Sequence, residues 1–556
     1  MVLATSVEAH SDQATPRPLS ARVEYLSLTL LIVIAVTRVI MTYSVFSEVV
    51  DEPHQIAGGM QWIDQHAFMI VPSNPPLPRI LFALGPYLDG ARFVTTSNPI
   101  DSGNAILYSG DYTRRLSLAR TGNLPFLVLA IVVVWSLTRR LFGQVEALLA
   151  AALFTLLPEI LGNAGLATTD LAIAATLGAT ILVLVEWLDR PTVSRTIALG
   201  GTIAMTILSK FSAFLFLPAS AAVLVGFHLL ARGRNAPTLN LGLMRLAGRA
   251  ALLVTSTCLI IWAGYFCSWL PASRDLELVL PDSALRPAFD LLQRTGMPLP
   301  APGFIAGVTM LFEINRRPNF PSYFMGGVHR TGHVLYYPVL VAVKTPIPYL
   351  LLGLAGSVLF VRCRLQMPWA APALGVAGLA ILMVSMSFRI NSGSRHILPI
   401  YVLLAPPAGA AALHCWRAWR TVGPTLIALL IGSMLASSVA SHPDYLAYFN
   451  FIAGKHPERI SVTADLDWGQ DLFRIREAVE AYRVDRLWLA YFGSAIPPRH
   501  DLGVPIRMLP PGRKVHGWIA VSEVFRHPIW TGGYLWLNAY QPVAQIGKSI
   551  WLYRIP

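Results

Sequence analysis

Long apolar runs alternate with polar segments along most of the chain. Several of these runs reach the roughly 20 residues that a helix needs to cross a ~30 Å hydrocarbon layer. The pattern predicts about eleven membrane-spanning helices, some of them short for a full crossing. Their expected limits are 24–46, 122–138, 145–158, 170–188, 196–209, 211–230, 250–270, 336–360, 369–387, 397–414 and 424–441.

Arginines give this predicted topology a direction. They occupy alternate connections between the apolar runs, and short arginine-rich loops stay in the cytoplasm. The arginines that set the alternation are Arg17, Arg22, Arg139, Arg140, Arg190, Arg195, Arg232, Arg234, Arg245, Arg249, Arg362, Arg364, Arg417 and Arg420. We therefore expect a cytoplasmic tail at 1–23 and a transmembrane domain at 24–441, with outer loops at 47–121 and 271–335.

The last part of the chain has a different pattern. Residues 442–556 alternate short β-rich runs (RISVTA, RLWLAYFG, GWIAVSE and SIWLYRI) with one helical pattern, WGQDLFRIREAVEAY. Such alternation is typical of a small α/β domain. The predicted fold class is therefore a polytopic α-helical membrane protein with a small C-terminal extracytoplasmic α/β domain at 442–556.

Composition agrees with a membrane protein. Of 556 residues, 54% are hydrophobic and 13% are charged, which is too apolar for an ordinary soluble enzyme. The net charge is +13, but the basic residues are dispersed in the inner loops, so nothing argues for nucleic-acid binding. The four cysteines show neither a disulfide framework nor the spacing of a zinc site.

An acidic pair stands where the first apolar run ends. In SEVVDEPHQIAGGMQWI, Asp51 and Glu52 are followed by Pro53 and His54. One interpretation is helix capping, with Asp51 as the N-cap residue and Pro53 in the first turn. The other is general-base catalysis, in which Asp51 takes a proton from an acceptor hydroxyl or amine. Capping leaves Glu52 and His54 without a role.

More charged residues lie in or beside the predicted spans on the outer side. They are Asp170, Lys210, Lys344, Arg395 and His396. An ionised group inside a bilayer is costly and usually faces a cavity or a partner. Simpler roles are a helix cap for Asp170, snorkelling for Lys344 and a neutral buried His396. Together, these cations and carboxylates fit a lipid-linked phosphate that carries a neutral sugar.

Several motifs resemble one superfamily of membrane enzymes. DEPH after the first span is similar to the Asp-Glu motif of GT-C glycosyltransferases, as in protein O-mannosyltransferases and the bacterial lipid A aminoarabinose transferase. Other segments resemble this superfamily or bacterial phospholipid-carrier-dependent glycosyltransferases: NPPLPRILFAL, LPEILGNAGLATTDLAIAATL, YYPVLVAVKTPIPYLL, SGSRHILPIYVLLAP, YLAYFN and DLDWGQDL. Their order and sidedness carry the resemblance, which covers nearly the whole chain.

The resemblance implies an inverting glycosyltransferase in a bacterial cytoplasmic (inner) membrane, with its active site on the outer face. Such enzymes transfer a monosaccharide, hexosyl or pentosyl, from a polyprenyl-phosphate carrier to an extracytoplasmic protein, lipid or glycan. Carried over by residue, Asp51 would be the general base and Glu52 would orient the acceptor. The expected partners are thus the lipid-linked sugar donor, the acceptor and the lipid bilayer.

The resemblance also implies the residues that bind substrate. These are His54, Arg79, Asp170, Lys210, Lys344, Arg395 and His396, of which the last four are candidates for the donor phosphate. Asn74 stands where a His or Lys is common before the Pro-Pro, so Arg79 could supply that contact instead. Asp51, His54 and Asp170 could hold a divalent cation, but the resembled protein mannosyltransferases do not depend on one. No metal or other cofactor is predicted.

Two other classes of function remain as alternatives. A transporter or flippase for a lipid-linked sugar would also need cations and carboxylates near a cavity, but carriers often have repeated halves and this chain has no internal repeat. A structural assembly subunit would neither transfer nor move the lipid. In TADLDWGQDLFRI, the clustered acidic residues and Trp468 are interpreted as capping and core packing, with recognition of an acceptor as the alternative.

Overall fold

The computed structural model describes residues 19–556 except 234–236, 238–241, 272–289, 291–293, 296–297, 317–320, 363–367 and 531. Most of the predicted cytoplasmic tail at 1–23 lies outside the described residues. The same holds for part of the predicted outer loop at 271–335.

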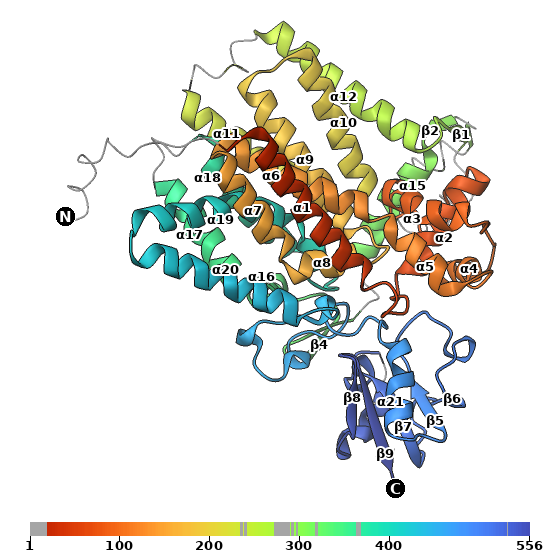
Figure 1. Cartoon of the computed structure of the whole chain (residues 1–556). Helices are drawn as coiled ribbons and strands as arrows, with labels where there is room; N and C mark the ends of the chain where they lie inside the picture. Colours follow the sequence, from red (N-terminus) through yellow and green to blue (C-terminus); the bar gives the residue numbers. More distant parts are fainter. Residues whose placement is uncertain are drawn as a thin grey trace.

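Apolar helices form a bundle (Figure 1). They are α1 Ala21–Ile40, α6 Leu124–Leu141, α7 Gln144–Thr155, α8 Pro158–Ala164, α9 Asp170–Asp189, α10 Val193–Ser209, α11 Ala213–Arg232, α12 Leu243–Gly264, α16 Tyr336–Lys344, α17 Ile347–Arg362, α18 Ala370–Ser385, α19 Pro399–Ala418 and α20 Val422–Ala440. Prolines mark several helix starts, as at Pro158 and Pro399, because the first turn has no use for the missing N–H.

The predicted membrane spans are confirmed in part. Within the described residues, six helices are long and apolar enough to cross a membrane, and the number rises to eight if two bent helix pairs each form one span. The pairs are α7–α8, bent by 65°, and α16–α17, bent by 114°. Helices α10 and α18 are apolar but have only 17 and 16 residues. The predicted number of about eleven is therefore not confirmed, because several apolar helices are short or broken.

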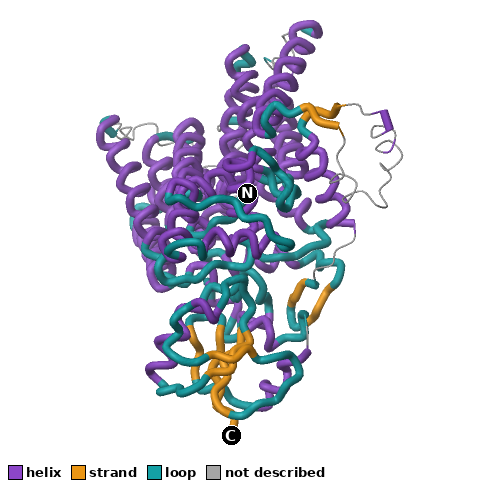
Figure 2. The backbone as a smooth tube through the Cα atoms, turned by 90° about the vertical axis from the view of Figure 1, so that its right-hand side faces the viewer, coloured by secondary structure: helices purple, strands orange, loops and turns teal. Residues whose placement is uncertain are grey.

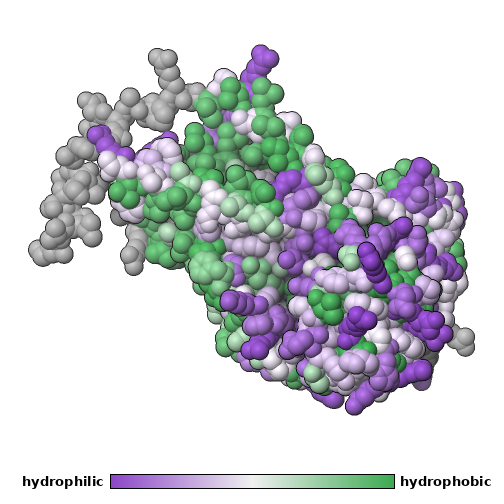
Figure 3. Space-filling model, turned by 60° about the horizontal axis from the view of Figure 1, so that its bottom comes forward, coloured by the Kyte–Doolittle hydropathy of each residue, from purple (hydrophilic) through white to green (hydrophobic). Residues whose placement is uncertain are grey.

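Apolar side chains also cover the surface of the bundle. In α12, only 6% of the most apolar 18-residue stretch is buried, and Leu243, Met244 and Val254 are exposed. Figure 3 shows apolar surface over the bundle and a more polar surface over the C-terminal region. Soluble monomers rarely expose apolar patches of this extent. The chain is therefore a multi-pass membrane protein.

Four short helices follow α1 within the predicted outer loop at 47–121 (Figure 1). They are α2 Glu52–Gln65, α3 Pro76–Leu88, α4 Pro99–Leu107 and α5 Tyr112–Thr121. A second insertion between α12 and α16 contains α15 Pro302–Arg316 and two short hairpins. The hairpin strands are β1 Trp269–Pro271 with β2 Pro298–Pro300, and β3 Ser322–Phe324 with β4 Gly327–His329.

A five-stranded sheet forms the core of the C-terminal domain, with the strand order β6-β5-β7-β9-β8. Its strands are β5 Leu487–Ala490, β6 Ile506–Met508, β7 Gly517–Ser522, β8 Ala544–Ile546 and β9 Ile550–Ile555. Strand β5 is parallel to β6 and β7, whereas β9 is antiparallel to β7 and β8. Helix α21 Ile475–Ala481 packs on one face, through Ile475 and Val479. The sheet-containing C-terminal region is thus confirmed.

This sheet domain lies against the end of the bundle where α1 finishes (Figures 1 and 2). We call this the domain end. Backbone hydrogen bonds join the segment after α1 to the C-terminal region, from Ser47 N to Gln470 O at 3.0 Å and from Val50 N to Trp468 O at 3.1 Å. The segment that carries the acidic pair is therefore held directly by the C-terminal region.

The arginine alternation predicts that the domain end faces away from the cytoplasm. Single cysteines test this in a chain whose four native cysteines are replaced by serine. Ser97→Cys and Lys514→Cys lie in exposed positions of the predicted outer segments, and Ser194→Cys lies in an exposed position at the opposite end. An impermeant thiol reagent added to spheroplasts should label the first two and spare the third. Labelling of Ser194→Cys with protection of Lys514→Cys would contradict the predicted topology and place the domain end in the cytoplasm.

Candidate functional site

Asp51 is the N-cap residue of α2, but its side chain makes no capping hydrogen bond. Its Oδ2 instead accepts a hydrogen bond from Arg395 Nη1 at 2.6 Å, and the Asp51 side chain keeps 25% of its exposure. Burial by itself would raise the pKa of Asp51. The guanidinium of Arg395 outweighs this effect and holds the pKa below its ordinary value. Asp51 is therefore an ionised and partly accessible carboxylate, and capping does not account for it.

Asp170 joins the same charges from the first turn of α9, where Thr169 and not Asp170 is the N-cap residue. Its Oδ1 pairs with Lys210 Nζ, and its Oδ2 lies 3.7 Å from Arg395 Nη1. Lys210 ends α10, and its Nζ lies 3.2 Å from His396 Nδ1. These contacts link helix ends that are far apart in the sequence.

We call Asp51, Asp170, Lys210, Arg395 and His396 the ionic cluster. Its last two residues lie on a short 3-10 helix, η3 Ser394–Ile397, directly before α19. Burial, followed by the charge of Lys210, holds the pKa of His396 well below its usual range, so this ring is neutral near pH 7. Two carboxylates and two cations therefore balance one another at the domain end.

Glu52, next to Asp51, is turned into the protein. Its carboxylate accepts hydrogen bonds from Arg120 Nε and Nη2, both at 2.9 Å. It also accepts the backbone N–H of Val49 and of Ala167, each at 2.8 Å. Both side chains of the Glu52–Arg120 pair are buried. Glu52 thus joins the start of α2 to α5 and to the loop before α9, and its oxygens already have four donors.

A third carboxylate, Glu48, lies three residues before Asp51. Its side chain is fully buried. Burial raises the pKa of Glu48 to about 8, so this carboxyl is mostly protonated at pH 7. Of the three neighbouring carboxyl groups, only Asp51 is partly accessible to solvent, and it is ionised beside Arg395. The surroundings therefore assign different protonation states to acids that the sequence does not distinguish.

His54 lies within reach of the charges of Asp51 and Arg395, and its backbone is held by Arg79. His54 lies in the first turn of α2, and burial lowers its pKa to about 4. Arg79 Nη2 donates to the backbone oxygen of His54 at 2.8 Å, and its other donors reach the backbone oxygens of Gln55, Val71 and Asn74. Arg79 is fully buried and its donors are occupied by backbone oxygens.

Lys344 also lies outside the ionic cluster, in a second buried network. Its Nζ is 2.9 Å from Glu159 Oε1 and donates to the backbone oxygens of Leu446 and Asp465. Glu159 in turn accepts the hydroxyl of Ser394 at 2.7 Å, next to Arg395. Lys344 is fully buried, so its ammonium group does not snorkel to the membrane surface. Its charge is instead compensated by Glu159.

Five of the nine predicted site residues therefore meet in the ionic cluster, and Glu52, His54, Arg79 and Lys344 contact other groups. The sequence analysis does not identify Arg120 and Glu159, the buried partners of Glu52 and Lys344. Both are charged residues beside an apolar run, the same feature that identifies Lys210 and Arg395 as candidates. This feature could therefore have identified Arg120 and Glu159 as well.

The set Asp51, His54 and Asp170 does not form a metal site. Within the described ranges, no group of three or more His, Cys, Asp or Glu side chains is placed to hold a metal ion. Arg395 Nη1 lies between the carboxylates of Asp51 and Asp170. The guanidinium of Arg395 thus provides the positive charge between these two carboxylates.

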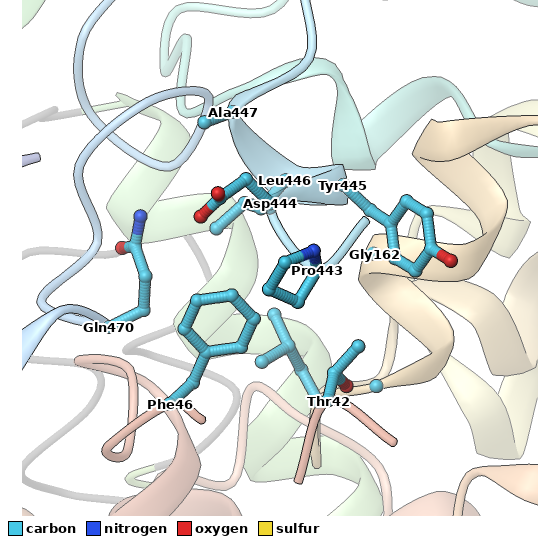
Figure 4. A pocket seen from close by; sticks show the side chains of 11 residues that line it. Thr42, Phe46, Gly162, Pro443, Asp444, Tyr445, Leu446, Ala447 and Gln470 are labelled. Carbon is cyan, nitrogen blue, oxygen red and sulfur yellow. The ribbon is translucent and has the colours of Figure 1, made fainter. Parts of the chain in front are cut away.

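A pocket opens at the domain end between α1, α8 and the segment that follows α20 (Figure 4). It is lined by Thr42, Phe46, Gly162, Gly165, Leu166, Pro443, Asp444, Tyr445, Leu446, Ala447 and Gln470. None of these residues belongs to the ionic cluster. Gln470 lines the pocket from the segment that also contains Trp468.

Comparisons with known proteins agree with this architecture. Residues 119–262 match a family model described as dolichyl-phosphate-mannose-protein mannosyltransferase. A search of curated protein sequences finds no significant match. The crystal structure of ArnT from Cupriavidus metallidurans bound to undecaprenyl phosphate is similar, with a TM-score of 0.50 and 14% identity over 94% of this chain and 97% of that chain.

The Archaeoglobus fulgidus oligosaccharyltransferase, solved with a tethered acceptor peptide, is similar as well. Its TM-score is 0.51 with 15% identity, covering 87% of this chain and 64% of that chain. The chain therefore has the fold of the GT-C superfamily of membrane glycosyltransferases, as the sequence motifs predict.

Proposed function

We propose that this protein is an inverting glycosyltransferase that transfers a monosaccharide from a polyprenyl phosphate to an extracytoplasmic acceptor. The observation that carries the proposal is the ionic cluster. It places an ionised, partly exposed carboxylate beside an arginine, a lysine and a neutral histidine at the ends of apolar helices. The bacterial inner membrane and a site on its outer face belong to the same proposal. The ArnT structure, which holds undecaprenyl phosphate, supports the choice of carrier.

Each member of the cluster has a chemical task in this proposal. The acceptor attacks the anomeric carbon of the sugar from the side opposite the phosphate, while Asp51 takes the acceptor proton. The bond between the anomeric carbon and the phosphate oxygen breaks, and its electron pair stays on the polyprenyl phosphate. Arg395 and Lys210 stabilise the negative charge on the departing phosphate. One displacement inverts the anomeric configuration.

The buried pairs have a positioning task. Glu52 holds the backbone that carries Asp51, through Arg120 and Val49. Lys344 and Glu159 hold η3, through Ser394. Asp170 holds Lys210 and Arg395 side by side. These contacts support roles for Glu52 and Lys344 in orienting the site, without contact to acceptor or phosphate.

A transfer assay separates this proposal from a carrier. Purified protein is incubated in liposomes with radiolabelled undecaprenyl-phosphate sugars and with envelope acceptors. Release of undecaprenyl phosphate with label in the acceptor supports transfer. Movement of the intact lipid-linked sugar across the bilayer, without release, would replace the proposal by the transporter alternative.

Lys210 and Lys344 should differ in phosphate binding. Lys210→Met removes a charge-assisted contact worth about 1.5–3 kcal/mol, so affinity for undecaprenyl phosphate should fall roughly tenfold or more. Lys210→Arg should retain much of it. Lys344→Met should instead lower thermal stability, because Glu159 is left buried without its partner. Titration of the detergent-purified variants with undecaprenyl phosphate measures both. If Lys344→Met weakened phosphate binding and Lys210→Met did not, the phosphate contact would be assigned to Lys344 instead.

A further inference from the structure

Trp468 of the C-terminal region contacts the ionic cluster directly. The guanidinium carbon of Arg395 lies 4.1 Å from the centre of the Trp468 ring, a cation–π distance. The indole is 3% exposed and packs with Val49, Leu166 and Ala464 in one small apolar cluster. One side of the arginine therefore rests on a ring that is itself held by apolar packing.

The edges of the Arg395 guanidinium have separate partners. Nε donates to the backbone oxygen of Ser392 at 2.9 Å, and Nη2 donates to the Ser392 hydroxyl at 3.2 Å. Nη1 reaches Asp51 at 2.6 Å. An arginine side chain has many rotamers, and its planar guanidinium can be restrained by hydrogen bonds along its edge and by stacking of its face on an aromatic ring. Ser392 restrains the edge, and Trp468 restrains the face.

The same C-terminal segment also holds the chain on which Asp51 lies. Trp468 O accepts Val50 N, Gln470 O accepts Ser47 N at 3.0 Å, and Gly469 O accepts the Ser47 hydroxyl at 2.9 Å. Residues 47–50 lead directly into Asp51. Both partners of the Asp51–Arg395 ion pair are thus placed by residues 468–470.

Two glycines shape the segments that meet here. Gly469 has φ +90°, and a Cβ there would lie 2.7 Å from Phe492 O, so the glycine lets residues 468–470 pack against their own domain. Gly393, two residues before Arg395, has φ +89°, and a Cβ there would lie 3.1 Å from Ala464 Cβ. L side chains rarely adopt such backbone conformations. Asp465 completes the contact, because its Oδ1 accepts both the backbone N–H and the hydroxyl of Ser394.

We propose that residues 465–471 are a positioning element of the glycosyl-transfer site, and that Trp468 acts by orienting Arg395 toward the phosphate and toward Asp51. This inference rests on the proposed function. It gives the C-terminal domain a part in the chemistry of the bundle, through one aromatic face and a short run of backbone hydrogen bonds. Trp468 is a positioning residue, and its effect passes through Arg395.

The test measures affinity of the full-length protein for undecaprenyl phosphate. Trp468→Leu removes the ring and keeps apolar bulk, so binding should weaken roughly five- to tenfold as Arg395 loses its orientation. Trp468→Phe keeps an aromatic face and should retain most of the affinity. In an Arg395→Met background, Trp468→Leu should cause no further loss, because residues that act through one another are not additive.

Trp488 provides a matched control in the same domain. It lies on β5, and its ring faces the guanidinium of Arg513 at 5.2 Å. Trp488→Leu should leave phosphate affinity unchanged. Losses that multiply in the Trp468→Leu/Arg395→Met double variant, or equal losses in the Leu and Phe variants, would overturn the inference. Wild-type affinity in Arg395→Met would instead contradict the phosphate role in the proposed function.

Discussion

Asp51→Asn should lose most turnover while it keeps its fold. An amide cannot accept the acceptor proton, and general-base catalysis typically contributes ~10²–10⁴-fold to a rate. The carboxylate makes no capping hydrogen bond, so no helix cap is lost. Because the pKa of Asp51 lies below its ordinary value, the carboxylate of the proposed base is ionised throughout the neutral range. The wild-type protein should therefore lose activity only as pH falls through that lowered pKa. Turnover at saturating donor, beside the melting temperature, measures both properties.

Asp111 is the control for this substitution. It is the N-cap residue of α5 and accepts the backbone N–H of Arg114 at 2.9 Å. Asparagine caps about as well as aspartate, so Asp111→Asn should retain both stability and turnover. Near wild-type turnover in Asp51→Asn would remove the catalytic base from the proposed mechanism.

Glu52→Gln should be among the most destabilising single changes in this chain. The substitution leaves the Arg120 guanidinium buried without its counter-charge, and breaking a buried ion pair from one side typically costs about 3–5 kcal/mol. The backbone N–H groups of Val49 and Ala167 would also lose a charged acceptor. The yield of folded protein in detergent and its thermal midpoint give the measurement.

A surface pair supplies the comparison for Glu52. Glu480 pairs with Arg476 at 3.1 Å while both side chains stay largely exposed, and such solvent-screened pairs contribute little to stability. Glu480→Gln should therefore be nearly neutral. The double variant Glu52→Gln with Arg120→Met should recover part of the lost stability, because the uncompensated charge is gone. Equal stability of Glu52→Gln and wild type would mean that the pair does not hold the start of α2.

The sequence predicts part of this site because an ionisable residue beside an apolar run needs a partner. Asp51, Asp170, Lys210, Arg395 and His396 satisfy that need with one another. The same signal marks Lys344, whose partner is Glu159. Sequence spacing shows that a charge must be paired but not with which group, since pairing depends on how helices from distant segments meet.

The C-terminal domain shows a similar limit for strands. The runs RLWLAYFG, GWIAVSE and SIWLYRI contain β5, β7 and β9, which lie together in the sheet. The edge strands β6 and β8 have three residues each, too few for an alternating pattern. RISVTA forms no strand and has only an isolated bridge from Thr463 to Asp467. Its apolar residue Val462 is buried in a loop that packs against Tyr323 and Val524.

The large sequence separation of the Asp51–Arg395 ion pair has a consequence for the biosynthesis of the protein. The two residues are 344 positions apart, a stretch that takes about 20–70 s to translate at roughly 5–20 residues per second. Throughout that interval Asp51 has been synthesised and Arg395 has not. Trp468 follows later still. A chain stopped after α12 would contain Asp51, Asp170 and Lys210 but neither Arg395 nor Trp468. The ionic cluster and the ring that packs on its arginine are therefore completed only late in synthesis.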